Sequence, residues 1–271
     1  MKQKNKKLVA KKHLGQNWLD DPATLIAMCE AADVQHSDFV LEVGPGPGSL
    51  TRVLLSQAKK VFAVEKDDRF RMSLELLRDS ESNFDYIIGD ILTFDIDKRV
   101  EQEKDFKVVA NIPYYITSEI IAKLIALKNK PKAVALMTQK EVAQSLADPK
   151  RIKSVAALIL KCYATAEYVR TVPAILFTPQ PKVDSAILKL TFLKKPLHDI
   201  LSDNIFLSVA KAAYRGKRKM LSNSLASNLK LSSEDLNRAF TESKVSKDAR
   251  PENLTLTEWK NLVQEIKIRS L

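Results

Sequence analysis

The sequence has few of the residues that build disulfide frameworks, and it lacks long apolar runs. Its 271 residues include two cysteines, Cys29 and Cys162, which lie far apart in apolar, helix-like surroundings. We expect both to be reduced core residues, which favours a cytosolic protein. No run approaches the ~18 apolar residues of a membrane span. The N-terminal stretch also lacks the apolar region of a secretory signal, so we expect no membrane association.

Metal ligands are equally sparse. The three histidines, His13, His36 and His198, are scattered along the chain. There is no Cys-x-x-Cys motif and no carboxylate pair at ligand spacing, which are the patterns that hold structural or catalytic metals. The sequence therefore predicts no metal site and no histidine-based catalytic dyad.

Positive charge is abundant and unevenly placed. Lys and Arg number 44 against 33 Asp and Glu, giving a net charge of +11 and a pI near 9.5. The first 12 residues carry six lysines and no acid, and the 211–219 run carries five basic residues and no acid. A solubilising tail and a solvated helix face would explain either run alone, but together they favour RNA or DNA. The predicted phosphate contacts are Lys11, Lys12, Lys211, Arg215, Lys217, Arg218 and Lys219.

Strand-like and helix-like runs alternate over the first two-thirds of the chain. Such alternation predicts a doubly wound, mostly parallel α/β sheet with helices on both faces. Residues 185–192 alternate in a way that suits an antiparallel edge strand. Thr117 or Ser118 should cap the helix predicted at 119–129. The expected strands are 39–43, 61–64, 86–88, 107–110 and 133–137, and the expected helices include 49–58 and 140–147.

The pattern changes near residue 195. We expect an α/β domain over residues 1–195, with a basic N-terminal tail, and a small all-helical domain over 196–271, whose basic run would make it the RNA-binding domain. Its helices are predicted at 205–214, 219–228, 234–240 and 256–268. Thr255 and Glu258 form a capping-box signature at the start of the last helix.

Three successive strand ends carry residues suited to a nucleoside. In an open parallel sheet, ligands bind beyond the carboxyl ends of the strands. Gly44, Gly46 and Gly48 follow the first strand, and glycine allows close approach to the backbone. Glu65 ends the second strand, where an acid can accept both hydroxyls of a ribose, and Asp90 ends the third. The third glycine comes one residue too early for a dinucleotide fingerprint, so S-adenosylmethionine fits this pocket better than NAD.

At this point the chain resembles a known family. The run GPGPGSLT, then VEKD, GDIL and NIPYYITSEII, is similar to S-adenosylmethionine-dependent adenine-N6 methyltransferases. KKHLGQNWLDD, FTPQPKVDSAILKL, KAAYRGKRKMLSNSL and ARPENLTLTEW resemble segments of the ribosomal RNA adenine dimethyltransferases. Trp18 stands where the family usually has Phe. Residues 147–158 lack the glycines expected there, which leaves the shape and RNA contacts of that loop open.

The resemblance implies an activity and its partners. The expected enzyme transfers methyl groups from S-adenosylmethionine to the N6 amines of two adjacent adenosines near the 3′ end of small-subunit (16S) rRNA, giving N6,N6-dimethyladenosine. It would act in small-subunit biogenesis, as a monomer, on rRNA in a partly assembled subunit. The implied cofactor-binding residues are Asn17, Leu19, Gly44, Gly46, Glu65, Asp90 and Asn111.

Residues 111–114 follow the fourth strand and suit the chemistry of an adenine amine. This amine is a poor nucleophile, because its lone pair is delocalised into the ring. Two acceptors, the Asn111 side-chain carbonyl and the Ile112 backbone carbonyl, would hold the amine toward the methyl group. Pro113 would fix the peptide that carries the second acceptor. Tyr114 would stack on the extruded base, Phe177 would cover its other face, and Tyr115 would pack under the loop.

Three alternatives remain. An erythromycin-resistance-type methyltransferase of large-subunit rRNA shares the pocket, although residues 249–259 fit the small-subunit enzyme better. A non-catalytic RNA-binding assembly factor could keep the fold. A dinucleotide-dependent oxidoreductase would bind NAD.

Overall fold

The computed structural model describes residues 10–11, 14–103, 105–194, 204–216, 219–229 and 231–269. The chain forms two compact units. The first combines Met1–Ala143 with Glu167–Leu190, and the second combines Gln144–Ala166 with Thr191–Leu271. The division differs from the expected boundary at residue 195, because residues 144–166 group with the C-terminal helices.

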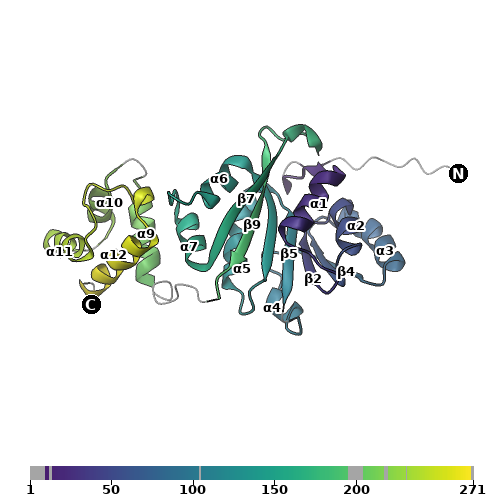
Figure 1. Cartoon of the computed structure of the whole chain (residues 1–271), viewed down its shortest axis with the longest axis horizontal. Helices are drawn as coiled ribbons and strands as arrows, with labels where there is room; N and C mark the ends of the chain where they lie inside the picture. The colour runs from purple at the N-terminus through teal and green to yellow at the C-terminus, as the bar shows by residue number, and fades with distance from the viewer. Residues whose placement is uncertain are drawn as a thin grey trace. The chain divides into compact units, whose positions relative to one another are not determined.

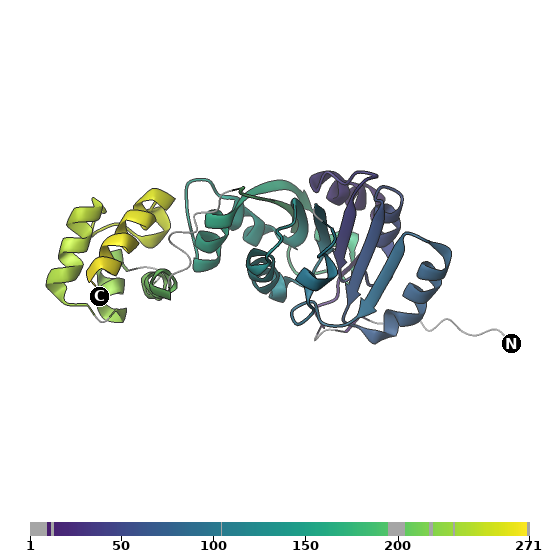
Figure 2. The same ribbon diagram turned by 90° about the horizontal axis from the view of Figure 1, so that it is seen from below.

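A seven-stranded sheet, with order β4-β3-β2-β5-β6-β9-β7, forms the framework of the fold (Figure 1). The strands from β4 to β6 are parallel, and β9 runs antiparallel to β6. Figure 2 shows the first strands of the sheet, coloured purple to blue, side by side. The strands are β2 (Phe39–Val43), β3 (Lys60–Glu65), β4 (Phe84–Ile88), β5 (Phe106–Asn111), β6 (Ala133–Gln139), β7 (Ala164–Val172) and β9 (Ser185–Phe192). The doubly wound α/β prediction is confirmed.

The central strands are buried on both faces, which is why their sequences are nearly continuous apolar runs. All five residues of β2 and the first five of β5 are buried. One face of the sheet packs on α1, α2 and α3. The helices of this unit are α1 (Pro22–Ala31), α2 (Ser49–Leu55), α3 (Arg71–Ser80), α4 (Ile96–Arg99), α5 (Thr117–Ala126) and α6 (Lys140–Ala147), the last of which continues into the second unit.

Two local predictions were wrong. The 185–192 strand is not at the edge, because β7 lies beyond it in the sheet. The cap of α5 is Ile116, which makes no side-chain cap bond. Thr117 instead begins the helix, and its hydroxyl donates to the Tyr114 carbonyl at 3.0 Å.

A short two-stranded sheet joins the N-terminal segment to the loop before β9. β1 (Trp18–Leu19) pairs antiparallel with β8 (Phe177–Thr178). This pairing brings residues that are about 160 positions apart in the sequence into register, with Leu19 opposite Phe177. It fixes the N-terminal segment close to the strand ends.

The second unit is helical. It contains α7 (Val155–Tyr163), α9 (Asn204–Tyr214), α10 (Leu221–Asn228), α11 (Ser233–Ser243) and α12 (Leu256–Arg269). The predicted capping box of α12 is confirmed: the Thr255 N–H donates to Glu258 Oε2 at 2.7 Å, and the Glu258 N–H donates to Thr255 Oγ1 at 3.2 Å.

The segment before α7 belongs to this unit for a physical reason. The Tyr214 hydroxyl donates to the Ile152 carbonyl, and the Ile152 N–H donates to the Glu252 carbonyl at 2.9 Å. Ser154 caps α7 by accepting from the Ala157 N–H at 3.1 Å. Backbone bonds to two later segments therefore give the glycine-poor 147–158 loop a defined path.

Within the described ranges, no helix has the length and apolar character needed to cross a membrane. The same ranges contain no cluster of His, Cys, Asp and Glu that could hold a metal ion.

Candidate functional site

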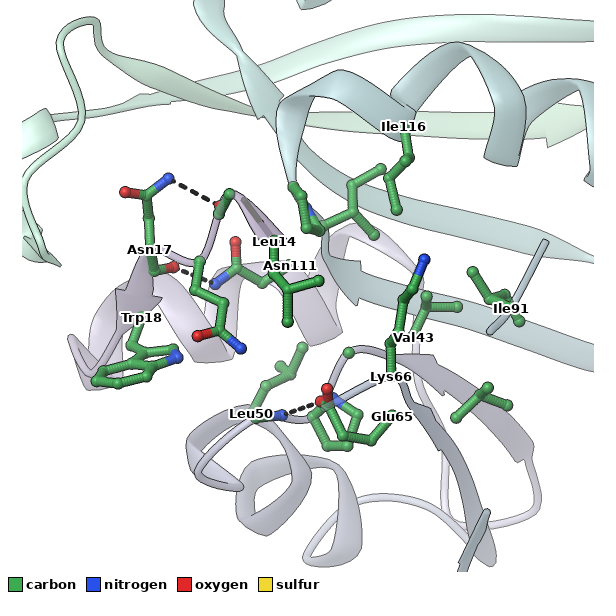
Figure 3. A pocket seen from close by; sticks show the side chains of 18 of the residues that line it. Leu14, Asn17, Trp18, Val43, Leu50, Glu65, Lys66, Ile91, Asn111 and Ile116 are labelled. Atoms are coloured by element: carbon green, nitrogen blue, oxygen red, sulfur yellow. Dashed lines mark hydrogen bonds between the residues drawn. The ribbon is translucent and has the colours of Figure 1, made fainter. Parts of the chain in front are cut away.

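A cavity opens at the carboxyl ends of β2, β3, β4 and β5. The four strand ends contribute Gly44–Pro47, Glu65–Lys66, Gly89–Leu92 and Asn111–Ile116, and residues 14–19 complete the wall. Figure 3 shows side chains from these separate segments, including Asn17, Glu65 and Asn111, around the cavity. The structure thus brings together the strand-end residues that the sequence singled out, as expected for an open parallel sheet.

The glycine loop adopts a backbone that favours glycine. Gly44, Gly46 and Gly48 have φ values of +71°, +53° and +88°, in the left-handed region. A Cβ atom on Gly46 would lie 3.6 Å from the Trp18 ring. The loop therefore leaves its backbone exposed to the cavity while Trp18 packs closely against it.

Glu65 lines the cavity, although only 5% of its surface is exposed to solvent. Its Oε2 accepts from the Gly46 N–H at 2.9 Å, as drawn in Figure 3, and its Oε1 accepts from the Asp67 N–H at 2.7 Å. Burial raises the pKa of Glu65, whereas the bonds from Asp67 and Gly46 lower it. These two backbone donors orient the carboxylate, and its remaining lone pairs can accept ligand hydroxyls.

Asp90 lines the cavity at the end of β4 and takes part in an ion pair. Its Oδ2 accepts from Lys66 Nζ at 2.7 Å, and its Oδ1 accepts from the Leu92 N–H at 2.9 Å. The bond from Lys66 is the main reason that the pKa of Asp90 is lowered. Lys66 also lines the cavity, a role that sequence reasoning missed, because a lysine after a strand normally suggests only a solvated surface.

A buried carboxylate ties the N-terminal segment to the sheet. Asp67 accepts from Arg69, from Gln16 Nε2 at 2.8 Å and from Lys11 Nζ at 3.0 Å. The bond from Arg69 is the largest cause of the lowered pKa of Asp67. Lys11, predicted to contact RNA phosphates, is thus engaged in an intramolecular ion pair. The physical reason is that a buried carboxylate needs compensating charge.

Asn17 and Asn111 are linked across the cavity. Asn111 Nδ2 donates to the Asn17 carbonyl at 3.3 Å, and Asn17 Nδ2 donates to the Gly15 carbonyl at 3.2 Å (Figure 3). Because the Asn111 nitrogen is directed to Asn17, its Oδ1 is the amide atom left to accept from a ligand. Leu19, in β1, is buried and lines the same wall.

The residues after Asn111 form a short rigid turn. Pro113 has φ −58° and ψ 134°, and Tyr114–Ile116 form the 3₁₀ turn η3. Tyr114 lines the cavity, and its hydroxyl lies 2.6 Å from Ser185 Oγ. Tyr115 is 56% exposed, and its ring lies 3.2 Å from where a Cβ of Gly15 would be. Tyr115 therefore does not pack under the loop as expected; it contacts Gly15 and lines the cavity.

Phe177 is buried in the structure, and its expected stacking on the base stays a prediction. It is 3% exposed and belongs to the hydrophobic core. The described residues that line the cavity do not include Phe177.

The basic run in the second unit is not one continuous helix. α9 ends at Tyr214 and α10 begins at Leu221. Lys211, Arg215 and Lys219 are exposed, and Arg215 donates to Asn228 Oδ1 at 3.2 Å. Lys12, Lys217 and Arg218, which are also predicted to contact RNA, lie outside the described residues. Phosphate binding by this run stays a prediction.

The chain matches known proteins over nearly its whole length. The family model for ribosomal RNA adenine dimethylase matches residues 7–267. A ribosomal RNA small subunit methyltransferase A from Clostridium acetobutylicum is 39% identical over 257 residues, covering 94% of this chain and 93% of the relative. A protein of the same name from Dehalococcoides mccartyi is 35% identical over 258 residues, covering 95% and 89%.

Two solved structures share the whole fold. A dimethyladenosine transferase from Plasmodium falciparum has a TM-score of 0.73 at 27% identity, covering 93% of this chain and 98% of that one. The 23S rRNA methyltransferase ErmE has a TM-score of 0.72 at 28% identity, covering 93% and 100%. Fold likeness alone therefore does not separate the two kinds of enzyme, but the family model and the sequence relatives agree with the strand-end geometry: this chain belongs to the ribosomal RNA adenine dimethylase family.

Proposed function

We propose that the protein methylates the N6 amines of two adjacent adenosines near the 3′ end of small-subunit (16S) rRNA, giving N6,N6-dimethyladenosine. The single observation that carries the proposal is the orientation of Asn111. Its amide nitrogen is held by the Asn17 carbonyl, so its oxygen is left to accept from an amine at the cavity. Family membership and relatives named small subunit methyltransferases support the choice of RNA.

The residues of the cavity fit S-adenosylmethionine. Glu65 would hold the ribose hydroxyls, Asp90 the adenine amine, and Gly44, Gly46, Asn17 and Leu19 would lie against the ligand. A pyrophosphate fits less well at the start of α2. Ser49, the first residue of this helix, donates its hydroxyl to the Asp20 carboxylate at 2.8 Å, so a negative charge already lies at the helix start. When bound, S-adenosylmethionine supplies an electrophilic methyl group on a sulfonium centre.

The protein's contribution is to hold the amine in position. Asn111 Oδ1 and the Ile112 carbonyl would accept the two amine protons, so that the nitrogen lone pair is directed away from both acceptors. Pro113 limits the motion of the second acceptor, and Tyr114 would stack on the base, a contact worth ~1–3 kcal/mol. Preorganised acceptors of this kind need no rearrangement during the reaction.

Two alternatives predict different results. The large-subunit enzyme is represented by ErmE, but the sequence relatives at 35–39% identity are named for the small subunit. A non-catalytic assembly factor has no need of an oriented Asn111 or a paired Glu65. A monomeric state and a partly assembled subunit as substrate remain part of this proposal.

The direct test is mass spectrometry of ribosomal RNA. Unmethylated small and large subunits are each incubated with the protein and isotopically labelled S-adenosylmethionine. The expected product is dimethyladenosine at two adjacent positions of small-subunit rRNA. Label in large-subunit rRNA alone would reject the proposal, and binding without label in either RNA would favour the assembly factor.

Asp90→Asn is expected to weaken S-adenosylmethionine binding about tenfold, by roughly the 1.4 kcal/mol of one charged hydrogen bond. The substitution removes one negative charge and can direct an amide N–H₂ toward the adenine amine. The measurement is isothermal titration with S-adenosylmethionine. Asp68→Asn is the matched control, because Asp68 is also ion-paired, with Arg71 at 2.6 Å, but does not line the cavity. Equal loss of affinity in both variants would contradict the assignment of Asp90.

A further inference from the structure

Tyr114 is held at both ends by buried hydroxyl groups. Its own hydroxyl lies 2.6 Å from Ser185 Oγ, and its backbone carbonyl accepts from Thr117 Oγ1 at 3.0 Å. Thr138 Oγ1 lies 3.1 Å from Thr117 Oγ1. Since a hydroxyl has one proton, and Thr117 donates its proton to Tyr114, Thr138 must donate to Thr117. Thr117, Thr138 and Ser185 are all buried.

The hydroxyls of Thr138 and Ser185 come from the two faces of the β6–β9 pair, whereas Thr117 begins α5. Thr138 is paired with Ala186, and Ser185 is paired with Gln139. Paired residues of an antiparallel ladder share a face, and neighbours along a strand point to opposite faces. Thr138 and Ser185 therefore hold Tyr114 from opposite faces at the end of the sheet, one through its backbone and the other through its ring.

Ser185 is not needed to hold the turn that precedes it. Asp184 Oδ1 accepts from the Ala174 N–H at 3.1 Å, and the Asp184 carbonyl accepts from the Lys140 N–H at 3.0 Å. The neighbouring residue thus fastens this turn to two other segments. The Ser185 hydroxyl is directed instead to Tyr114, a residue that lines the cavity.

We propose that Ser185 is a positioning residue for methyl transfer, which fixes the Tyr114 ring as a preset platform for the target adenine. The inference rests on the proposed function. A ring held only at its backbone would lose rotational freedom when the base arrives, which raises the free energy of the productive complex. The bond to Ser185 removes this freedom before binding, so its effect should fall on the transfer rate and RNA affinity rather than on cofactor affinity.

A double-mutant cycle tests this role. Ser185→Ala, Tyr114→Phe and the double variant are compared in methyl transfer to small-subunit rRNA at saturating S-adenosylmethionine. Loss of one hydrogen bond predicts that each single variant lowers kcat/KM for RNA by about 2- to 10-fold. The double variant should be no slower than the slower single variant, because both remove the same bond. Cofactor affinity should not change. Multiplying effects, or an unchanged rate in Ser185→Ala, would overturn the proposal.

A second measurement does not depend on activity. In protein labelled with fluorotyrosine, the Tyr114 signal is assigned by its loss in Tyr114→Phe. Ser185→Ala should shift and broaden this signal, because the ring gains alternative orientations, and an unchanged signal would overturn the anchoring role. Ser243→Ala is the matched control: Ser243 is also buried, and its hydroxyl donates to the Phe240 carbonyl at 3.2 Å in the second unit. This control should leave both the signal and the rate unchanged. If the wild-type protein methylates no small-subunit RNA, the proposed function fails, and the fluorine signal still reports whether Ser185 anchors the ring.

Discussion

Asn111→Ala is expected to slow methyl transfer by about 100- to 1,000-fold, the cost of removing one preorganised group that acts on the reacting centre. The amide oxygen of Asn111 is the acceptor that the Asn17 carbonyl leaves available by binding the amide nitrogen. Without it, the target amine would be held by the Ile112 carbonyl alone. The rate is measured in a single turnover, with excess enzyme and saturating S-adenosylmethionine, so that binding does not limit it.

Asn83→Ala is a suitable control for Asn111→Ala. Asn83 also donates its amide nitrogen to backbone carbonyls, those of Leu55 at 3.2 Å and Ala58 at 3.4 Å, but it does not line the cavity. The Asn83→Ala variant should have a lower free energy of unfolding than the wild type but the same rate of methyl transfer. RNA affinity should remain nearly unchanged in Asn111→Ala. A parallel loss of RNA binding and rate would show that Asn111 organises the site rather than the amine.

Glu42→Gln is expected to remove most of a steep pH dependence of stability. Glu42 lies in β2, two residues before the glycine loop, and is 1% exposed. Among the described residues, neither of its carboxylate oxygens has a hydrogen-bond partner. Burial raises the pKa of Glu42 from 4.5 to about 8; the nearby Thr51 hydroxyl opposes this increase, and the negative charge of Glu65 adds to it. Glu42 is therefore protonated in the folded protein at neutral pH.

The sign of the effect follows from proton binding. The folded state keeps a proton on Glu42 up to pH 8, whereas the unfolded state loses it near pH 4.5. This contribution to stability is therefore complete below pH 4.5 and is lost as the pH rises toward 8. Over the whole window the loss is on the order of 4 kcal/mol. Glutamine is neutral at every pH and should flatten this part of the profile.

The measurement is the free energy of unfolding in urea at several pH values between 5 and 9, for the wild type and for Glu42→Gln. Glu30→Gln is the control, because Glu30 is exposed on α1 and its replacement should keep the wild-type slope. An unchanged slope in Glu42→Gln would mean that another group binds the proton or that the Glu42 carboxylate gains a partner in solution.

The parallel strands and their ends could be predicted because their signals are local. β2 and β5 are buried on both faces, so their sequences are apolar runs, interrupted only by Glu42 and Lys107, that stop at glycines or at Asn111. Glu65 and Asp90 could be placed in one cavity because parallel strands present their carboxyl ends at the same edge. These predictions needed no knowledge of distant contacts.

The remaining features depend on partners that are distant in the sequence. Strand β7 is not among the predicted strands. Its burial pattern is irregular and includes exposed polar residues, so the apolar periodicity that indicates a strand is weak. The ion pair of Lys11 with Asp67 was not predicted, because nothing near Lys11 in the sequence indicates that Asp67 is buried and requires a cation. Phosphate binding by Lys11 stays a prediction. The burial of Phe177 in the core depends on packing against distant segments, and its stacking on the base stays a prediction. The contact of Ser185 with Tyr114 joins residues 71 positions apart.

The bonds around Ile152 have a consequence for protein engineering. The second unit is discontinuous, since it takes Gln144–Ala166 from the middle of the chain. The Tyr214 side-chain hydroxyl and the Glu252 carbonyl each form a hydrogen bond with the backbone of Ile152, in that inserted segment. A chimaera joined at residue 195 would separate these partners and leave buried polar groups unpaired. An exchange of the helical unit between relatives should therefore transfer both pieces together, with three junctions rather than one.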